Sequence, residues 1–70
     1  EKCLLSEIER FIREALLLLP HELRITIVLR EFEGLSYEDI SKITKTGLGT
    51  VKSRISRARN KLQDILKEFI

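Results

Sequence analysis

The sequence predicts an all-α fold, a compact domain of four helices whose last two form a helix-turn-helix with a long recognition helix. Apolar residues recur at helical spacing along most of the chain. No segment alternates apolar and polar residues over the length of a strand. The single proline and the three glycines fall where the helical spacing is interrupted. With 70 residues, the chain has room for one hydrophobic core.

Pro20 divides the first two predicted helices. A first helix ending near Leu19 is predicted because one face collects Leu4, Leu5, Ile8, Phe11, Ile12, Ala15, Leu16 and Leu19. Proline suits the first turn of a helix and not its interior, so a second helix is predicted over about residues 20–33. Its apolar residues form two groups, Ile25, Val28, Leu29 and Phe32 on one side and Leu23 with Ile27 on the other. A helix that is apolar on two sides is expected to lie between two neighbours.

The third predicted helix is short and covers about residues 37–44. Gly34 before it fits the left-handed C′ position that ends the second helix. Ser36 and Asp39 resemble a capping box, in which the first side chain accepts a hydrogen bond from the backbone of the second. The buried side of this helix is expected to consist of Tyr37, Ile40 and Ile43.

A fourth and longer helix is predicted over about residues 50–68, after Gly47 and Gly49 interrupt the pattern. Packing of its apolar stripe over the first two helices is favoured over a dimer seam, so the isolated domain is expected to be a monomer. The stripe consists of Val51, Ile55, Ala58, Leu62, Ile65, Leu66 and Phe69.

The charges are segregated along the chain. Residues 1–39 carry nine acidic and five basic side chains, whereas residues 40–63 carry seven basic and no acidic ones. A solvated helix face normally mixes both signs. A basic block without carboxylates is typical of a surface that binds a phosphate backbone.

The fourth helix has the geometry of a recognition helix. At about 100° per residue, its pole opposite the apolar stripe is formed by small or slim residues. These are Gly49, Ser53, Ser56 and Asn60, flanked on one side by Lys52 and Arg59 and on the other by Thr50, Arg54, Arg57 and Lys61. A slim pole enters a major groove about 12 Å wide, and long cationic side chains on the flanks reach bases and phosphates. The pattern therefore predicts double-stranded DNA as the ligand.

Residues 19–62 resemble region 4 of the extracytoplasmic-function group of sigma-70 family sigma factors. The motifs that carry the resemblance are the Leu-Pro start, Gly-Leu-Ser-Tyr-Glu in the middle and Gly-Thr-Val-Lys-Ser-Arg near the end. The resemblance implies a region 4-like DNA-binding domain over residues 1–70, with the helix-turn-helix at about residues 36–62. It also implies that the domain recognises the promoter −35 element and docks on the β flap of the RNA polymerase core, with an anti-sigma factor as a further partner.

The same resemblance assigns roles to single residues. Family members read bases with the residues that follow Gly-Thr-Val, which here are Lys52, Ser53, Ser56 and Arg57. Contacts to the DNA backbone are then expected from Ser36, Lys42, Lys45, Thr50, Arg54, Arg59 and Lys61. The chain departs from the family pattern at Ser41, where an alanine is usual, and at Thr44-Lys45, where Leu-Gly is common. At Ser56, many relatives carry a larger ring or a histidine.

Two alternative functions remain open. Response-regulator output domains share the Gly-Leu-Ser start and a Thr-Val-Lys recognition helix, although the run Ser-Arg-x-x-Arg-Ala-Arg here favours the sigma factor. A helical protein-interaction module is the other alternative. The two-sided second helix, with Leu17 and Leu18, would then dock on polymerase or on an anti-sigma factor.

Nothing in the sequence indicates catalysis, a cofactor or a metal site. His21 and Cys3 are the only residues of their kinds and give no ligand cluster, so we interpret them as a surface residue and a packing residue. A helical bundle of this size offers no pocket for an enzyme's acid–base pair. The sequence leaves open whether four charged residues stay solvated or pair with the fourth helix: Arg24, Arg30, Glu31 and Glu38.

The cellular location is predicted from the absence of paired cysteines and of a long apolar segment. A lone cysteine cannot form an internal disulfide, which favours the reducing cytoplasm. The longest apolar run covers residues 15–19, so membrane insertion is not expected. The chain starts at Glu1 and not at methionine, as expected for a fragment of a longer protein.

Overall fold

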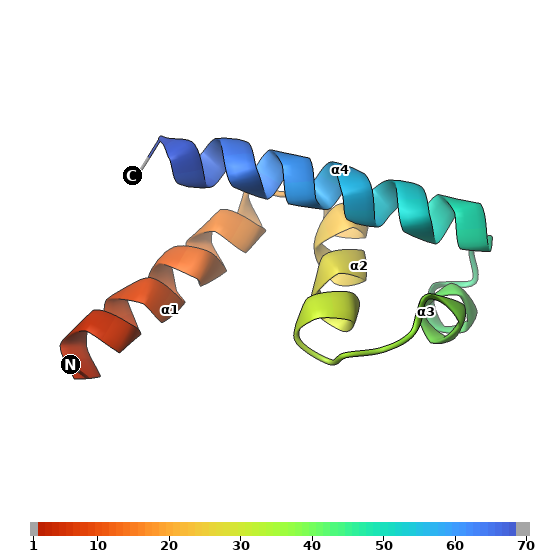
Figure 1. Cartoon of the computed structure of the whole chain (residues 1–70), viewed down its shortest axis with the longest axis horizontal. Helices are drawn as coiled ribbons and strands as arrows, with labels where there is room; N and C mark the ends of the chain where they lie inside the picture. Colours follow the sequence, from red (N-terminus) through yellow and green to blue (C-terminus); the bar gives the residue numbers. More distant parts are fainter. Residues whose placement is uncertain (1, 69–70) are drawn as a thin grey trace.

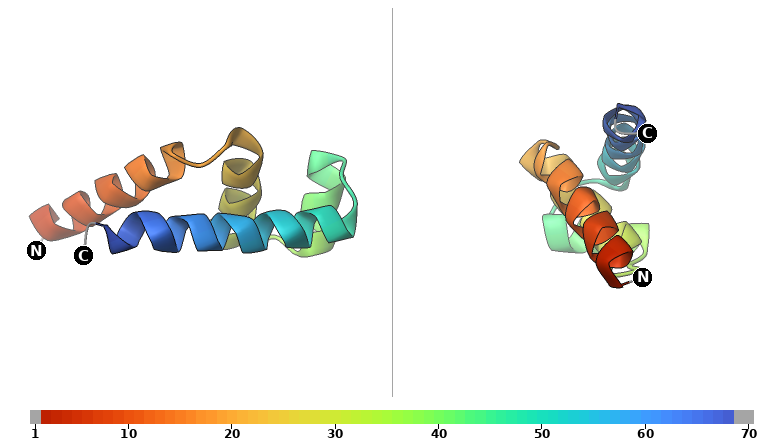
Figure 2. Two further views of the ribbon diagram at one scale, coloured as in Figure 1. Left: turned by 90° about the horizontal axis from the view of Figure 1, so that it is seen from above. Right: turned by 90° about the vertical axis from the view of Figure 1, so that its left-hand side faces the viewer.

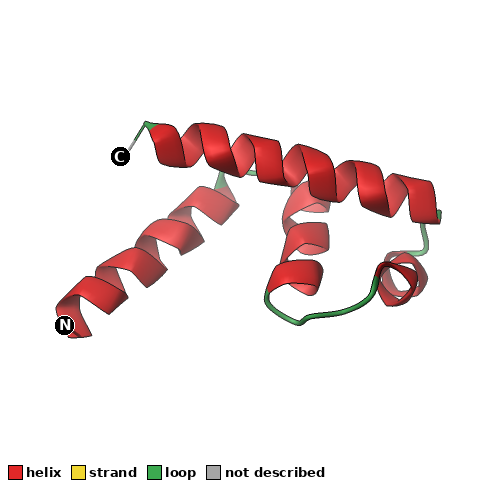
Figure 3. Cartoon of the chain, viewed as in Figure 1, coloured by secondary structure: helices red, strands yellow, loops and turns green. Residues whose placement is uncertain are grey.

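Four helices make up the described part of the chain, residues 2–68 of the computed structural model (Figures 1 and 3). They are α1 (Lys2–Leu17), α2 (His21–Glu31), α3 (Tyr37–Thr44) and α4 (Leu48–Lys67). No strand occurs among these residues. The all-α prediction is therefore confirmed, with the bounds of α3 as predicted.

The long helix α4 organises the fold. Figure 1 shows α4 along the length of the molecule, with α3 beneath its N-terminal end, α2 crossing it, and α1 under its C-terminal half. Figure 2 shows the same order from above and from the end. The helix α2 makes most of the tertiary contacts with α4, and α1 touches α4 less extensively. The orientation of α4 is therefore set mainly by α2 and α3.

The core lies where α2, α3 and the N-terminal half of α4 meet. Its largest fully buried side chains include Ile27, Ile40 and Ile55, one from each of these helices. The predicted stripe of α4 is confirmed at Val51, Ile55 and Ala58, which are all buried. The other buried members of the cluster are Leu19 and Leu23. Phe69 lies outside the described residues, and the same holds for the side chain of Cys3.

The second helix differs from the prediction in its bounds and in its burial. Pro20 is the residue before α2, with its carbonyl accepting from the backbone N–H of Arg24 at 2.9 Å, and α2 ends at Glu31. Only the Leu23–Ile27 side is buried, whereas Ile25 is 37% and Phe32 is 59% exposed. The expectation that α2 lies between two neighbours is confirmed in part: α2 contacts both α3 and α4, and Val28 and Leu29 pack against the core, but the rest of the second apolar side is exposed. Phe32 lines the groove towards α1, which diverges from α4 (Figure 1), whereas Ile25 lines the open depression that also contains Ile43.

The connection from α2 to α3 follows the predicted local signals. Gly34 adopts a left-handed conformation with φ 69°, but it is not the C′ residue as predicted: the C-cap of α2 is Phe32, so Gly34 lies one residue after C′. The Ser36 hydroxyl accepts a hydrogen bond from the Asp39 backbone N–H at 3.1 Å, as a capping residue does. Within α3, Ile40 is fully buried, but Ile43 is 57% exposed, so its predicted burial is wrong. Ile43 lies near the end of α3, and it faces an open depression instead of the core.

Side-chain hydroxyls hold the turn between α3 and α4. Lys45 occupies the left-handed region at φ 56° and ψ 42°, and Thr46 donates its backbone N–H to the Ser41 carbonyl at 3.1 Å. The Ser41 hydroxyl donates to the Thr46 carbonyl, and the Thr44 hydroxyl donates to the Ile40 carbonyl at 2.7 Å. These bonds fix the angle at which the chain enters α4.

The start of α4 lies two residues before the predicted one. Gly47 precedes the helix, Leu48 is its first residue, and Gly49 lies within the first turn. Glycine inside a helix costs only about 1 kcal/mol relative to alanine, so it does not stop a helix that gains burial from the following stripe. The expectation that Gly49 breaks the pattern is therefore wrong.

Replacing Lys45 by glycine is expected to raise the free energy of unfolding by about 0.5–1 kcal/mol. A residue with a Cβ is strained in the left-handed region, and glycine is not, although its freer unfolded chain offsets part of the gain. Urea denaturation followed by circular dichroism measures the change. Lys42→Gly is the control because Lys42 is helical, so the same substitution should destabilise by about 1 kcal/mol. A loss of stability in Lys45→Gly would contradict the prediction.

Candidate nucleic-acid interface

One face of α4 presents the four residues predicted to read bases. Lys52, Ser53, Ser56 and Arg57 are all exposed, and they lie opposite the buried stripe of the same helix. A helix that buries one side against α2 and α3 keeps the other free for a groove (Figure 2). The structure therefore brings these residues together on one surface.

The residues predicted to contact the DNA backbone lie around this face. Thr50 and Lys61 are exposed on α4, Lys42 is exposed in the last turn of α3, and Lys45 is exposed in the turn. Ser36 lies at the start of α3, where its hydroxyl is already occupied by the cap. Four of these five residues thus leave their polar groups without an intramolecular hydrogen bond or ion pair in the described part of the chain.

Two further predicted backbone residues are ion-paired with α2. Arg54 Nη2 lies 3.5 Å from Glu22 Oε2, and the Arg54 side chain is only 18% exposed. Arg59 donates from Nε at 3.1 Å and from Nη2 at 2.7 Å to Glu31 Oε1. Hydrogen bonding to the Glu31 carboxylate, which accepts, raises the pKa of Arg59 above its usual value. Glu22 and Glu31 lie at opposite ends of α2, so the two pairs tie both ends of that helix to α4.

The ion pairs separate two kinds of cation on the basic block. Lys42, Lys45, Lys52, Arg57 and Lys61 take part in no ion pair among residues 2–68, whereas Arg54 and Arg59 do. Cations without a carboxylate partner keep their full attraction for phosphate. The sequence could not make this separation, because the partners Glu22 and Glu31 lie about 30 residues away from the arginines.

Arg30 is a candidate that the sequence analysis did not assign to DNA. Its guanidinium lies 4.8 Å from the centre of the Tyr37 ring, and Nη1 donates to the Leu35 carbonyl at 2.9 Å. Arg30 and Tyr37 also line a shallow depression of about 400 Å³ with Ser36, Glu38, Leu48 and Lys52. The depression lies beside the recognition face, so Arg30 adds a cation near Lys52. No local sequence signal marks this arrangement, since it depends on how α2 meets α3.

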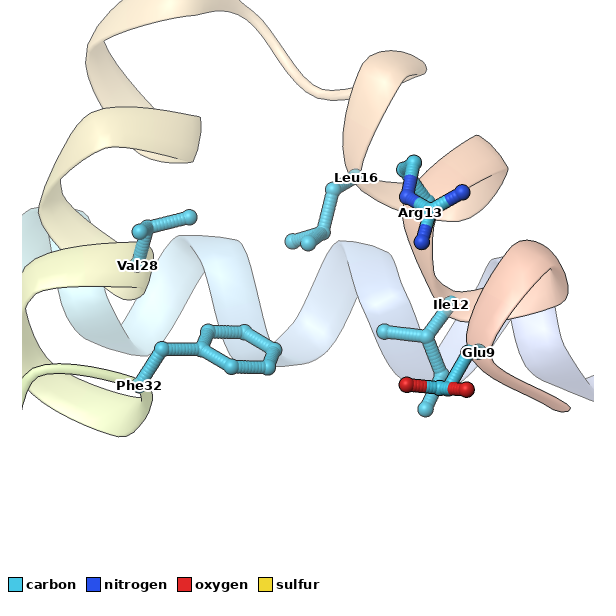
Figure 4. A pocket seen from close by; sticks show the side chains of 6 residues that line it. All are labelled: Glu9, Ile12, Arg13, Leu16, Val28 and Phe32. Carbon is cyan, nitrogen blue, oxygen red and sulfur yellow. The ribbon is translucent and has the colours of Figure 1, made fainter. Parts of the chain in front are cut away.

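A second surface lies between α1 and α2, where α1 diverges. It is an apolar groove of about 260 Å³, shown in Figure 4, with Ile12 and Leu16 on α1 facing Val28 and Phe32 on α2. Glu9 and Arg13 complete the lining. Leu17 and Leu18, at the end of α1, are 64% and 66% exposed. Such a groove is suited to binding apolar side chains of a partner protein.

Other kinds of site have little support in the described residues. Among residues 2–68, no group of three or more histidine, cysteine, aspartate or glutamate side chains is placed to hold a metal ion. His21 lies at the surface, where its ring contacts the Arg24 guanidinium at 3.4 Å. No described helix has the length and apolar character needed to span a membrane.

Comparison with known proteins identifies relatives of this chain. The protein-family description "Sigma-70, region 4" matches residues 11–62. The chain is 45% identical over 65 residues to RNA polymerase sigma-H factor of Pseudomonas aeruginosa, covering 93% of the chain and 34% of that protein. It is 49% identical over 65 residues to ECF RNA polymerase sigma-E factor of Haemophilus influenzae, covering 87% of the chain and 34% of that protein. For the sigma-E factor of Escherichia coli the identity is 43% over 72 residues, covering 96% and 38%. The chain thus spans about a third of the length of these relatives.

Proposed function

This chain belongs to the sigma-70 region 4 family, and from this premise we propose that it recognises the promoter −35 element and directs the RNA polymerase core to initiate there. The exposed face of α4 carries the proposal. It combines small side chains with cations, and no acidic residue occurs between residues 40 and 63. The proposed role is binding and not catalysis, and it requires a cytoplasmic location.

Within this proposal, two sets of residues have different tasks. Lys52, Ser53, Ser56 and Arg57 read base edges in the major groove. Backbone contacts, which fix the position of the domain on the duplex, come from Ser36, Lys42, Lys45, Thr50, Arg54, Arg59 and Lys61. Arg54 and Arg59 are each paired with a glutamate of α2, so a phosphate competes with that glutamate for the guanidinium. The proposed domain covers residues 1–70, with the helix-turn-helix at about residues 36–62.

Binding to a duplex is expected to weaken steeply with salt. Each phosphate contact changes the slope of log K against log salt concentration by about −0.9, because counterions are released from the DNA. Lys42→Ala removes an exposed cation outside the base-reading set, so it should weaken binding to all sequences alike and make the slope shallower by about 1. Fluorescence anisotropy with selected and mixed-sequence duplexes, between about 50 and 200 mM salt, measures both quantities. A Lys42→Ala loss confined to the selected sequence would contradict the assigned role.

A protein-docking function is supported by the groove between α1 and α2. We propose that this groove receives the β flap of the RNA polymerase core, with an anti-sigma factor as a competing partner. Its facing residues Leu16, Val28 and Phe32 are apolar, so association there depends on burial and responds little to salt. Salt dependence therefore distinguishes docking on polymerase from binding to DNA, and one domain can perform both.

The alternative of a free-standing regulator of the response-regulator type makes a different prediction about assembly. Such regulators gain affinity by engaging two half-sites as a dimer. The stripe of α4 is buried at Val51, Ile55 and Ala58 against the other helices, which supports a monomer. A stable dimer in sedimentation that protects a palindrome would favour the regulator over the sigma factor.

A further inference from the structure

The ion pair between Glu31 and Arg59 differs from the other pair on α4 in its accessibility. The Arg59 and Glu31 side chains are 50% and 45% exposed, whereas Arg54 is 18% exposed. Both partners of the Glu31–Arg59 pair can therefore be reached by a third charged group. Two donors of Arg59 converge on a single oxygen of Glu31, so the other guanidinium nitrogen, Nη1, is not used in this pair.

The position of Glu31 in its own helix is unfavourable. Glu31 is the last residue of α2, where the carbonyl ends of the helix carry partial negative charge. A carboxylate there is repelled by the helix dipole, so the Glu31 side chain alone does not stabilise α2. The contact with Arg59 is the only interaction of the Glu31 side chain that the described structure contains.

Arg59 occupies the same flank of α4 as Lys52, two turns further along the helix. Setting Thr50 at zero, about 100° per residue places Lys52 near 200° and Arg59 near 180°. In a helix-turn-helix the N-terminal part of the recognition helix contacts bases, so Arg59 lies where the helix leaves the groove and passes a phosphate strand. In the free chain, the Glu31 carboxylate takes the place at Arg59 that a phosphate oxygen would take.

We propose that Glu31 is an intramolecular competitor of DNA, which Arg59 exchanges for a backbone phosphate when the domain binds. The proposal rests on the proposed DNA-binding function and adds a residue of α2 that regulates it. Exchange replaces the two charge-assisted hydrogen bonds to Glu31 by bonds to a phosphate, so the free energy of DNA binding gains only the difference between them. Glu31 thereby lowers affinity for every sequence alike, and it leaves base discrimination to the exposed face of α4.

The test compares variants of the chain on a mixed-sequence duplex at low salt. Glu31→Gln removes the competitor, and Glu33→Gln is the matched control. Glu33 is exposed two residues away, and it forms no ion pair in the described part of the chain. Both variants remove one negative charge from the same region, so general repulsion of DNA changes equally. Glu31→Asp keeps the charge but withdraws it by one methylene, which separates the contact from the charge.

Glu31→Gln is expected to bind about two- to five-fold more tightly than Glu33→Gln, the range that an exposed ion pair allows. Glu31→Asp should bind more tightly than the unchanged chain, although its net charge is the same. In an Arg59→Ala background, the advantage of Glu31→Gln over Glu33→Gln should disappear. The advantage should also shrink as salt screens the pair. Unchanged thermal transitions in circular dichroism establish that the variants are folded.

Three results would overturn the inference alone: equal affinities of Glu31→Gln and Glu33→Gln, an advantage that persists in the Arg59→Ala background, or weaker binding by Glu31→Gln. The last result would mean that Glu31 acts by holding α2 on α4. A different failure applies to the proposed function. If the unchanged chain binds no duplex even at low salt, the proposed DNA-binding function is wrong. The proposed exchange of Glu31 for a phosphate is then wrong as well.

Discussion

Ile55→Ala is expected to lower the free energy of unfolding by about 2–5 kcal/mol. Ile55 is 1% exposed and belongs to the core cluster that joins α2, α3 and α4, together with Ile27 and Ile40. Truncation removes buried methyl groups and leaves a cavity between three helices. The net stability of a small domain is about 5 kcal/mol, so this loss unfolds a large fraction of the molecules. Urea denaturation followed by circular dichroism measures it.

Ile43→Ala provides the matched control for this prediction. It makes the same chemical change on α3, but Ile43 is 57% exposed, so little burial is lost. The expected change is within about 0.5 kcal/mol. Equal destabilisation by Ile55→Ala and Ile43→Ala would mean that the core is not where the described helices place it.

Arg57→Ala is expected to reduce discrimination between a preferred duplex and a one-base variant by about 1–3 kcal/mol. Arg57 is exposed on α4 and takes part in no ion pair among residues 2–68, so its guanidinium is available for a bidentate contact with a base. The preferred duplex is obtained by selection from a random library with the unchanged chain at low salt. Binding titrations of the unchanged chain and the variant on both duplexes give the discrimination.

Lys61→Ala is the control for Arg57→Ala. Lys61 is exposed and, like Arg57, takes part in no ion pair among residues 2–68. It lies one turn further from the N-terminus of the recognition helix. Its loss should weaken binding to both duplexes by the same factor, because phosphate contacts carry no direct sequence information. Equal losses on the two duplexes for Arg57→Ala would remove Arg57 from the base-reading set.

Sequence patterns over a few neighbouring residues were sufficient to predict the structural features that such residues determine by themselves. The bounds of α3 and the Ser36 cap follow from turn and capping preferences that a few neighbouring residues determine. The buried stripe of α4 follows from helical periodicity, because burial and exposure must alternate with the turn of the helix. The exposure of Lys52 and Arg57 then follows from the position of the stripe.

Features that depend on where a neighbouring helix ends could not be predicted in this way. Ile25 and Phe32 have the composition of a buried face, but both stay exposed, Phe32 beside the groove towards α1 and Ile25 in the depression that it shares with Ile43. The pairing of Glu31 with Arg59 likewise depends on the crossing of α2 over α4, and helical periodicity carries no information about that crossing. The extent of the cationic face was predictable, whereas the identity of its paired members was not.

The divergence of α1 also means that local stability is unequal along the chain. Ala15 is buried, but Ile8 and Ile12, towards the N-terminal end, are 44% and 38% exposed. Elements with few buried contacts open by local unfolding, at a lower free energy than global unfolding. Backbone amides in the N-terminal half of α1 should therefore exchange their hydrogens through local unfolding of that helix. Amides around Ile27 and Ile55 should exchange only when the whole domain unfolds cooperatively. A bound partner in the groove would slow exchange in α1 first, because it would supply the contacts that this helix lacks.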